Sequence, residues 1–201
     1  MSGSSSFINA RKYPRQARSA VMVETILEAA ARVLETGGLE AFNTNAVAEK
    51  AGVSIGSLYQ YFPAKEALLA TLIRRKRMVL VEAISDVKAQ AGALDLRSLI
   101  DGFIRAGLFQ QLQRPRLARS LEYAEAMLPI DEETEALKRS ITMAVADALR
   151  AHGVEEPEIA ARDLAALTRG MADAGGLFGE TDMPSLEHRV RRAAHGYLGL
   201  N

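Results

Sequence analysis

The side chains best suited to chemistry lie between residues 43 and 66. Two short amphipathic stretches meet there at Gly52, and the second carries polar, hydroxyl and aromatic groups with no acidic residue on its outward face. Such a face can enter a DNA major groove without repelling phosphate, and its side chains can bond to bases or phosphates. These outward residues are Ser54, Ile55, Gly56, Ser57, Tyr59, Gln60 and Tyr61.

Two short helices must hold this face in place. We expect helices at residues 44–50 and 55–61, with Gly52 supplying a positive φ at the turn and Asn43 or Thr44 and Ser54 as N-caps. Lys65 then begins the next helix, where its charge and the free N–H groups could hold a phosphate. The outline is a helix-turn-helix, which by itself is common among all-α proteins. Its predicted apolar underside comprises Val47, Ala51, Val53, Leu58 and Phe62.

The residue identities go further than this outline. The run Ala-Gly-Val-Ser-Ile-Gly-Ser-Leu-Tyr-Gln-Tyr-Phe-Pro-x-Lys-Glu at 51–66 closely resembles the N-terminal domain of the TetR (tetracycline repressor) family. Ile26-Leu-Glu-Ala-Ala and Ala67-Leu-Leu also fall where that family has them, so the resemblance covers about residues 21–72. It implies a homodimer on a near-palindromic operator, with one recognition helix per subunit in successive major grooves.

The resemblance also implies individual roles. Ile55, Gly56 and Tyr59 occupy base-facing positions, and Asn45 could reach a base edge or a phosphate. Asn43 stands where a Thr is usual, and Ile55 where many members carry a long polar or basic residue, which leaves the base read by Ile55 unpredictable. The phosphate-contacting positions are Thr44, Ser57, Gln60, Tyr61 and Lys65.

Helical periodicity extends through the rest of the chain, without sustained alternation typical of strands. This pattern predicts an all-α fold. The resemblance to the TetR family implies its division into an N-terminal three-helix helix-turn-helix DNA-binding domain and a larger helical C-terminal ligand-binding and dimerisation domain. The expected boundaries are a flexible basic arm at 1–20, the DNA-binding domain at 21–68 and the second domain at 69–201. The remaining helices are expected at residues 21–36, 65–90, 96–112, 116–127, about 134–152, 157–178 and 185–198.

Charge is distributed unevenly along this formally neutral chain. Residues 1–80 carry 11 Lys and Arg against 6 Asp and Glu, whereas residues 81–201 carry 14 against 19. This asymmetry favours a polyanion partner for the first part, with uneven surface charge as the alternative. Arg11, Lys12, Arg15 and Arg18 form a basic arm that either adds phosphate or minor-groove contacts or only aids solubility.

The second domain offers a dimer interface and a less defined pocket. Small residues crowd the helix at 157–178, which would let it and the last helix form a two-fold four-helix interface; a tightly packed monomer core is the alternative. Asp101, Arg105, Asp147 and Arg169 either orient a polar ligand group or are surface charges, and Arg189, Arg191 and Arg192 are expected on a solvated face. Candidate pocket residues, each of which could be plain core, are Phe103, Phe109, Tyr123, Met127, Met143 and Met171.

Several function classes find no support in the sequence. There is no Cys, no phosphate-binding or hydrolase glycine motif, and the histidines match no metalloprotease pattern. No apolar run approaches a membrane span, and no secretory signal is evident, so we expect a cytoplasmic non-enzyme without cofactor or metal. The resemblance to the TetR family implies instead a repressor that is released from its operator by a small molecule. A ligand-independent activator or architectural DNA binder, and a helical ligand carrier without DNA function, are the alternatives.

Overall fold

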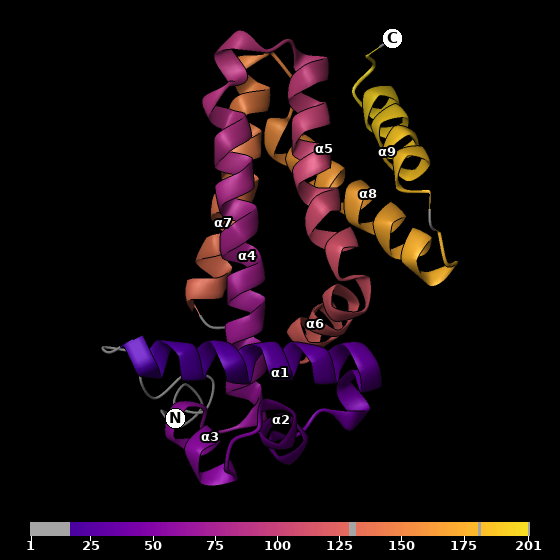
Figure 1. Cartoon of the computed structure of the whole chain (residues 1–201). Coiled ribbons are helices and arrows are strands. Elements are labelled where there is room, and N and C mark those ends of the chain that lie inside the picture. Colours follow the sequence, from indigo (N-terminus) through magenta and orange to yellow (C-terminus); the bar gives the residue numbers. More distant parts are fainter. Residues whose placement is uncertain (1–16, 129–131, 181, 201) are drawn as a thin grey trace. The chain divides into compact units, whose positions relative to one another are not determined.

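A computed structural model describes residues 17–128, 132–180 and 182–200, and every regular element in them is helical (Figure 1). The described chain forms two compact units, and α4 contributes to both. The all-α prediction is thus confirmed. The helices are α1 (Ala17–Ala41), α2 (Thr44–Ala51), α3 (Ile55–Tyr61), α4 (Lys65–Ala89), η2 (Ala91–Ala93), α5 (Leu96–Gln113), α6 (Pro115–Met127), α7 (Glu132–Ala151), α8 (Pro157–Leu177) and α9 (Met183–Tyr197).

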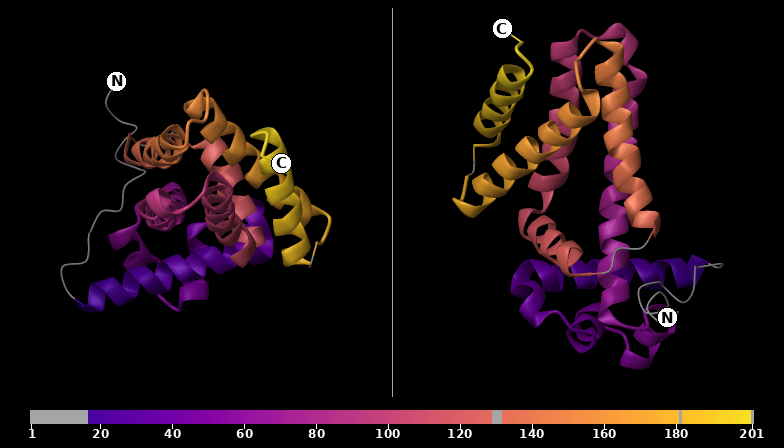
Figure 2. Two further views of the ribbon diagram at one scale, coloured as in Figure 1. Left: turned by 90° about the horizontal axis from the view of Figure 1, so that it is seen from above. Right: turned by 180° about the vertical axis from the view of Figure 1, so that it is seen from behind.

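The first unit comprises the chain up to Arg75 together with Arg116–Thr134. Both figures show α2 and α3 on the same side of α1 (Figures 1 and 2). Apolar side chains of α1 to α4 form one core, and α6 adds Leu121 and Ala124 to it. Since α6 lies inside the predicted second domain at 69–201, the packing divides the chain differently from a single cut in the sequence.

Several helix ends differ from the sequence-based expectation. Helix α1 begins at Ala17 and not at residue 21, so the expected flexible arm at 1–20 is wrong for residues 17–20, which include Arg18. The first helix was expected to stop at Gly37-Gly38, but α1 continues to Ala41 across a kink at Gly38, where φ is 63°. Leu39, beyond the kink, packs against the core, which favours one further turn. The last helix starts at Met183 instead of Ser185, because Asp182 is its N-cap and accepts a hydrogen bond from the Ser185 N–H at 2.9 Å.

The second unit comprises Lys76–Pro115 and Glu135–Asn201, and its core is built around α5. Helix α8 packs against both α5 and α9. On α9, Leu186, Val190 and Ala194 recur every four residues and are buried. This spacing places all three on one side of the helix, as the sequence predicts.

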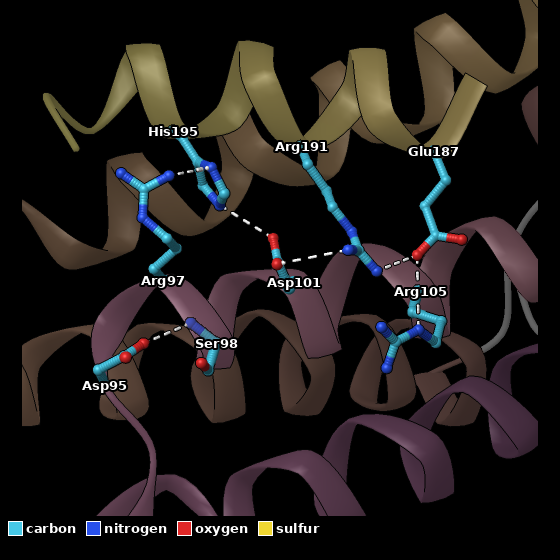
Figure 3. A network of polar contacts seen from close by, with 8 residues as sticks. All are labelled: Asp95, Arg97, Ser98, Asp101, Arg105, Glu187, Arg191 and His195. Atoms are coloured by element: carbon cyan, nitrogen blue, oxygen red, sulfur yellow. Dashed lines mark hydrogen bonds and ion pairs between the residues drawn. The ribbon is translucent and has the colours of Figure 1, made fainter. Parts of the chain in front are cut away.

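A row of charged side chains runs beside that apolar stripe (Figure 3). Arg97 donates to His195 Nδ1 at 2.9 Å, and His195 Nε2 lies 2.9 Å from an Asp101 carboxylate oxygen. Arg191 lies 3.5 Å from Asp101 and also pairs with Glu187, whose carboxylate is 3.5 Å from Arg105. We call this row the α5–α9 ladder; its members are Arg97, Asp101, Arg105, Glu187, Arg191 and His195.

The ladder corrects the expectation of a solvated arginine face on the last helix for Arg191 alone, since Arg189 and Arg192 are exposed. Arg191 is half-buried within the ladder, whereas Arg189 pairs with Glu180. The sequence alone does not show that Arg97, Asp101 and Arg105 of α5 lie at a spacing that matches the charged side chains of α9. Asp101 is likewise engaged with two side chains of α9.

Candidate nucleic-acid interface

Local hydrogen bonds fix the start of α2. Asn43 is its N-cap: its side-chain oxygen accepts from the Ala46 N–H at 2.9 Å, while its amide nitrogen donates to the Ala41 carbonyl at 3.2 Å. The helix ends at Gly52, where φ is 68°, in the left-handed region that favours glycine. These caps confirm the turn predicted from the sequence and resolve the choice between Asn43 and Thr44.

Helix α3 is capped by a serine and attached by apolar side chains. The Ser54 hydroxyl accepts from the Ser57 N–H at 3.0 Å. Leu58 and Phe62 are both 0% exposed in the core of the first unit. Since both contacts are on one side of the helix, the opposite side of α3 is left to solvent.

The proposed contact residues are distributed over that solvent side. Ile55 is 38% and Tyr59 43% exposed, so α3 presents an aliphatic and an aromatic side chain to solvent. Thr44, Ser57 and Tyr61 are half-buried. The other proposed contact residues are exposed: Asn45, Ser54, Gly56, Gln60 and Lys65.

Glycine at position 56 is not required by the fold of the free chain. A Cβ built there would meet only the Ser54 hydroxyl, at 3.8 Å, which is an ordinary contact distance. Its φ is not positive either. The absence of a side chain therefore leaves the backbone of α3 open to a close approach from outside.

A cross-helix hydrogen bond ties the face together. The Thr44 hydroxyl, at the start of α2, lies 3.2 Å from the Tyr59 phenol oxygen on α3. Helix α3 itself carries no charged residue, while Lys65 stands at the start of α4. The face can thus offer hydroxyl, amide and aromatic groups, and one flanking ammonium group, to a polyanion.

An ion pair between α1 and α4 supports this unit and was missed by the sequence reasoning. The Arg75 guanidinium donates to both Glu24 carboxylate oxygens, at 2.6 and 2.5 Å. This bidentate hydrogen bonding lowers the pKa of Glu24 below its ordinary value. The two residues are 51 positions apart, so no local pattern links them.

The six candidate pocket residues do not gather in one unit. Tyr123 and Met127 lie on α6 in the first unit, and both are exposed. Of those in the second unit, Phe109 and Met143 are exposed, Phe103 is buried and Met171 is half-buried. Their role in ligand binding stays a prediction.

Inside the second unit, a buried amide links three helices. Gln111 of α5 accepts from Lys76 of α4 at 3.1 Å and donates to Asp173 of α8 at 2.8 Å. Gln111 stands in the run Gln110-Gln-Leu-Gln113, and nothing in that run distinguishes it as the residue that links the helices.

The basic arm expected from the sequence is only partly described. Residues 1–16 fall outside the described residues, so Arg11, Lys12 and Arg15 are not placed, whereas Arg18 is in α1. Among the described helices, none is long and apolar enough to cross a membrane.

Comparison with known proteins supports the reading of the first unit. Residues 26–72 match the family described as "Bacterial regulatory proteins, tetR family". The HTH-type transcriptional repressor KstR of Mycobacterium tuberculosis (strain ATCC 25618 / H37Rv) is 36% identical over 100 residues, which cover 49% of this chain and 44% of the repressor. The chain thus spans about half the length of the curated relatives it matches.

Solved structures extend the likeness to the whole fold. A TetR-like transcriptional regulator from Rhodococcus sp. RHA1 is 25% identical with a TM-score of 0.65, covering 94% of this chain and all of that one. The fatty acid degradation regulator FadR from Bacillus halodurans has a TM-score of 0.70 at 18% identity, covering 87% of this chain and 98% of that one, and shows the fold alone.

Proposed function

We propose that this chain is a regulator of the TetR family and acts as a sequence-specific DNA-binding repressor of transcription. The observation that carries the proposal is the outward side of α3. It is uncharged and exposes Ile55 and Tyr59, while Leu58 and Phe62 hold the helix from the other side. A helix of this kind can enter a major groove while its apolar side stays packed against the core of the first unit.

The proposed contacts fall into two groups. Ile55, Gly56 and Tyr59 face the bases, where Ile55 and the Tyr59 ring offer apolar surface to a thymine methyl. Asn45 contacts a base edge or a phosphate, and Ser54 caps the recognition helix at its entry to the groove. The phosphates are held by Thr44, Ser57, Gln60, Tyr61 and Lys65.

We further propose that two copies of the chain pair through α8 and α9 on a near-palindromic operator. Helix α8 carries small residues on two sides. Ala160, Ala161 and Ala172 are buried within the chain, whereas Ala166, Gly170 and Ala174 recur every four residues and are exposed. A second stripe of small residues suits close packing against another helix. Half-sites would then be about 34–36 Å apart.

The proposed effector is a small molecule that binds the second unit. Helix α4 is continuous from Lys65, beside the recognition helix in sequence, to Ala89 in the second unit. A ligand that favours a conformer with α4 displaced would shift the recognition helices away from their half-sites and release the DNA. The ligand can shift this equilibrium only by its differential affinity for the two conformers.

The DNA-binding proposal is tested by selecting duplexes from a random-sequence pool with the purified chain. The enriched duplex and a scrambled duplex are then titrated by fluorescence anisotropy at several salt concentrations. We expect preference for the enriched sequence and an affinity that falls steeply with salt.

Tyr59→Ala should weaken binding to the enriched duplex, and Lys65→Ala should weaken binding more uniformly across sequences. Wild-type affinity in both variants would contradict the placement of the recognition helix.

The dimer proposal can be tested with a substitution that should leave the fold of the single chain unchanged. A Cβ at Gly170 would meet nothing within 4 Å in the chain, and the same holds at Gly92 in η2. Gly170→Leu should therefore fold normally but lower the dimer fraction in sedimentation velocity, while Gly92→Leu should leave that fraction unchanged. Equal sedimentation of the two variants and the wild type would remove α8 from the interface.

Two other functions are separated by the same assays. A ligand-independent activator or architectural protein would bind DNA but give a reporter response that no candidate inducer changes. A helical ligand carrier would show no salt-dependent affinity for either duplex. The exposed, uncharged side of α3 favours the DNA-binding functions over the carrier.

A further inference from the structure

The hydrogen bond between Thr44 and Tyr59 joins the first residue of α2 to the middle of the recognition helix. The two oxygens are 3.2 Å apart, and the residues are 15 positions apart in the chain. Tyr59 is 43% exposed, so part of the residue faces solvent while its phenol oxygen lies beside the Thr44 hydroxyl of α2. The ring is therefore held at both ends, at the backbone of α3 and at its hydroxyl.

Thr44 is a firm anchor for that hydroxyl. It follows the N-cap Asn43, whose side chain bonds in two directions, to the Ala46 N–H at 2.9 Å and the Ala41 carbonyl at 3.2 Å. The Asn43 carbonyl also accepts from the Val47 N–H at 3.1 Å. A threonine at this place is stiff about χ1 because its side chain is β-branched, and it is half-buried.

We propose that Thr44 is a positioning residue for DNA recognition: its hydroxyl holds the Tyr59 phenol and thereby fixes the ring in the orientation that reads a base. The inference rests on the proposed function. It gives Thr44 a second role, in addition to the phosphate contact proposed above. Fixing the ring in advance removes the entropy loss of ordering it on DNA, which for one side chain corresponds to about two- to tenfold in affinity. The orientation also decides which base the ring can touch.

Four variants test the role on the enriched duplex. Thr44→Val removes the hydroxyl at nearly constant shape, Thr44→Ser keeps it, and Tyr59→Phe keeps the ring but not its hydroxyl. We expect Thr44→Val and Tyr59→Phe each to bind about two- to tenfold more weakly and to lose preference at the same base pair. The double variant should be no weaker than the weaker single, and Thr44→Ser should match the wild type.

Independent effects of the two substitutions would overturn the proposal. If the free-energy changes of Thr44→Val and Tyr59→Phe add in the double variant, the two hydroxyls contact DNA separately. Wild-type binding by Thr44→Val would overturn it as well. Thermal unfolding of each variant is measured beside these titrations, so that a loss of fold is not taken for a loss of positioning.

A DNA-free measurement separates this inference from the proposed function. In protein with ¹³C-labelled tyrosine, the Tyr59 ring signals, assigned by their loss in Tyr59→Phe, should shift and sharpen in Thr44→Val and stay in place in Thr44→Ser. Unchanged Tyr59 signals in Thr44→Val would defeat the positioning role even if the wild type binds DNA well. A wild type that enriches no sequence would instead defeat the proposed function, and the role in recognition with it.

Discussion

Helices α3 and α9 are attached to their units in contrasting ways. Helix α3 is held by two side chains that are completely buried, Leu58 and Phe62, and its opposite side carries no charge. Helix α9 has a comparable apolar stripe, but a second row of its side chains is committed to the α5–α9 ladder (Figure 3). One helix keeps a whole side available to a partner, while the other uses polar groups to fix its own position.

The difference lies in what each kind of contact specifies. Apolar burial is non-directional and tolerates small shifts along a helix. The ladder alternates in sign, because Asp101 lies between His195 and Arg191, and Glu187 between Arg191 and Arg105. A shift of α9 by one turn along α5 would place like charges together. Charge order therefore fixes the register of α9, whereas shape and burial are enough for α3.

The largest expected effect comes from removing the apolar attachment of α3. Leu58→Ala should lower the free energy of unfolding of the first unit by about 2–5 kcal/mol, since it leaves a cavity in a filled core. Ile55→Ala, on the exposed side of the same helix, should change it by less than about 0.5 kcal/mol. Urea unfolding followed by circular dichroism measures both. Similar losses in the two variants would mean that α3 is not held from one side only.

The features that depend on local interactions are the ones that the sequence predicted well. The caps at Asn43 and Ser54, the turn at Gly52 and the buried pair Leu58 and Phe62 all depend on neighbours within a few residues. Short-range hydrogen bonding and helical periodicity are sufficient to place them.

The other features depend on contacts between residues far apart in the sequence, which helical periodicity does not encode. The pattern of α6 shows an apolar side, but not that Leu121 joins the core of the first unit. Arg191 and Asp101 are 90 positions apart, and each alone has the pattern of an ordinary surface charge. The candidate pocket was inferred from residue type only, which cannot distinguish an exposed Phe109 from a buried Phe103.

The second largest effect is expected in the ladder. Asp101→Asn removes the charge that faces both Arg191 and His195, and should lower the free energy of unfolding of the second unit by about 1–2 kcal/mol because the site is half-buried. Hydrogen exchange should show faster opening of α9 amides and no change in α3.

The matched control is Glu135→Gln in the same unit. It removes a partly exposed pair with Lys138 at 3.3 Å, within one turn of α7, and should change stability by about 0.2–0.5 kcal/mol. If the two variants lose the same stability, the ladder behaves as ordinary surface charge and the contrast with α3 fails.

A smaller effect is expected at a second histidine of this unit. Both ring nitrogens of His152 face carbonyl oxygens, of Ala148 at 2.8 Å and Leu94 at 3.0 Å, and only the protonated ring can donate to both. These bonds raise the pKa of His152 above its ordinary value of 6.5. The contribution to stability is therefore full below about pH 6.5 and is lost as pH rises through the higher folded pKa.

The measurement compares the wild type with His152→Gln, which cannot titrate in this range. The difference in free energy of unfolding should be larger at pH 5.5 than at pH 8.5, by up to about 1 kcal/mol. A constant difference for His152→Gln would show that its ring donates only one hydrogen bond at both pH values.

The smallest effect on stability, and the sharpest test of the freedom of α3, is expected at Ile55. Because this side chain contacts solvent and not the core, Ile55→Gln should change the free energy of unfolding by less than about 0.5 kcal/mol. Glutamine can pair with adenine through two hydrogen bonds, which isoleucine cannot do, so the selected sequence should change at one position of each half-site while overall affinity stays similar. Ile55→Leu keeps the apolar character and should retain the wild-type selection. An identical selection by Ile55→Gln and the wild type would remove Ile55 from base reading, and the free side of α3 would then act through Tyr59 and its neighbours alone.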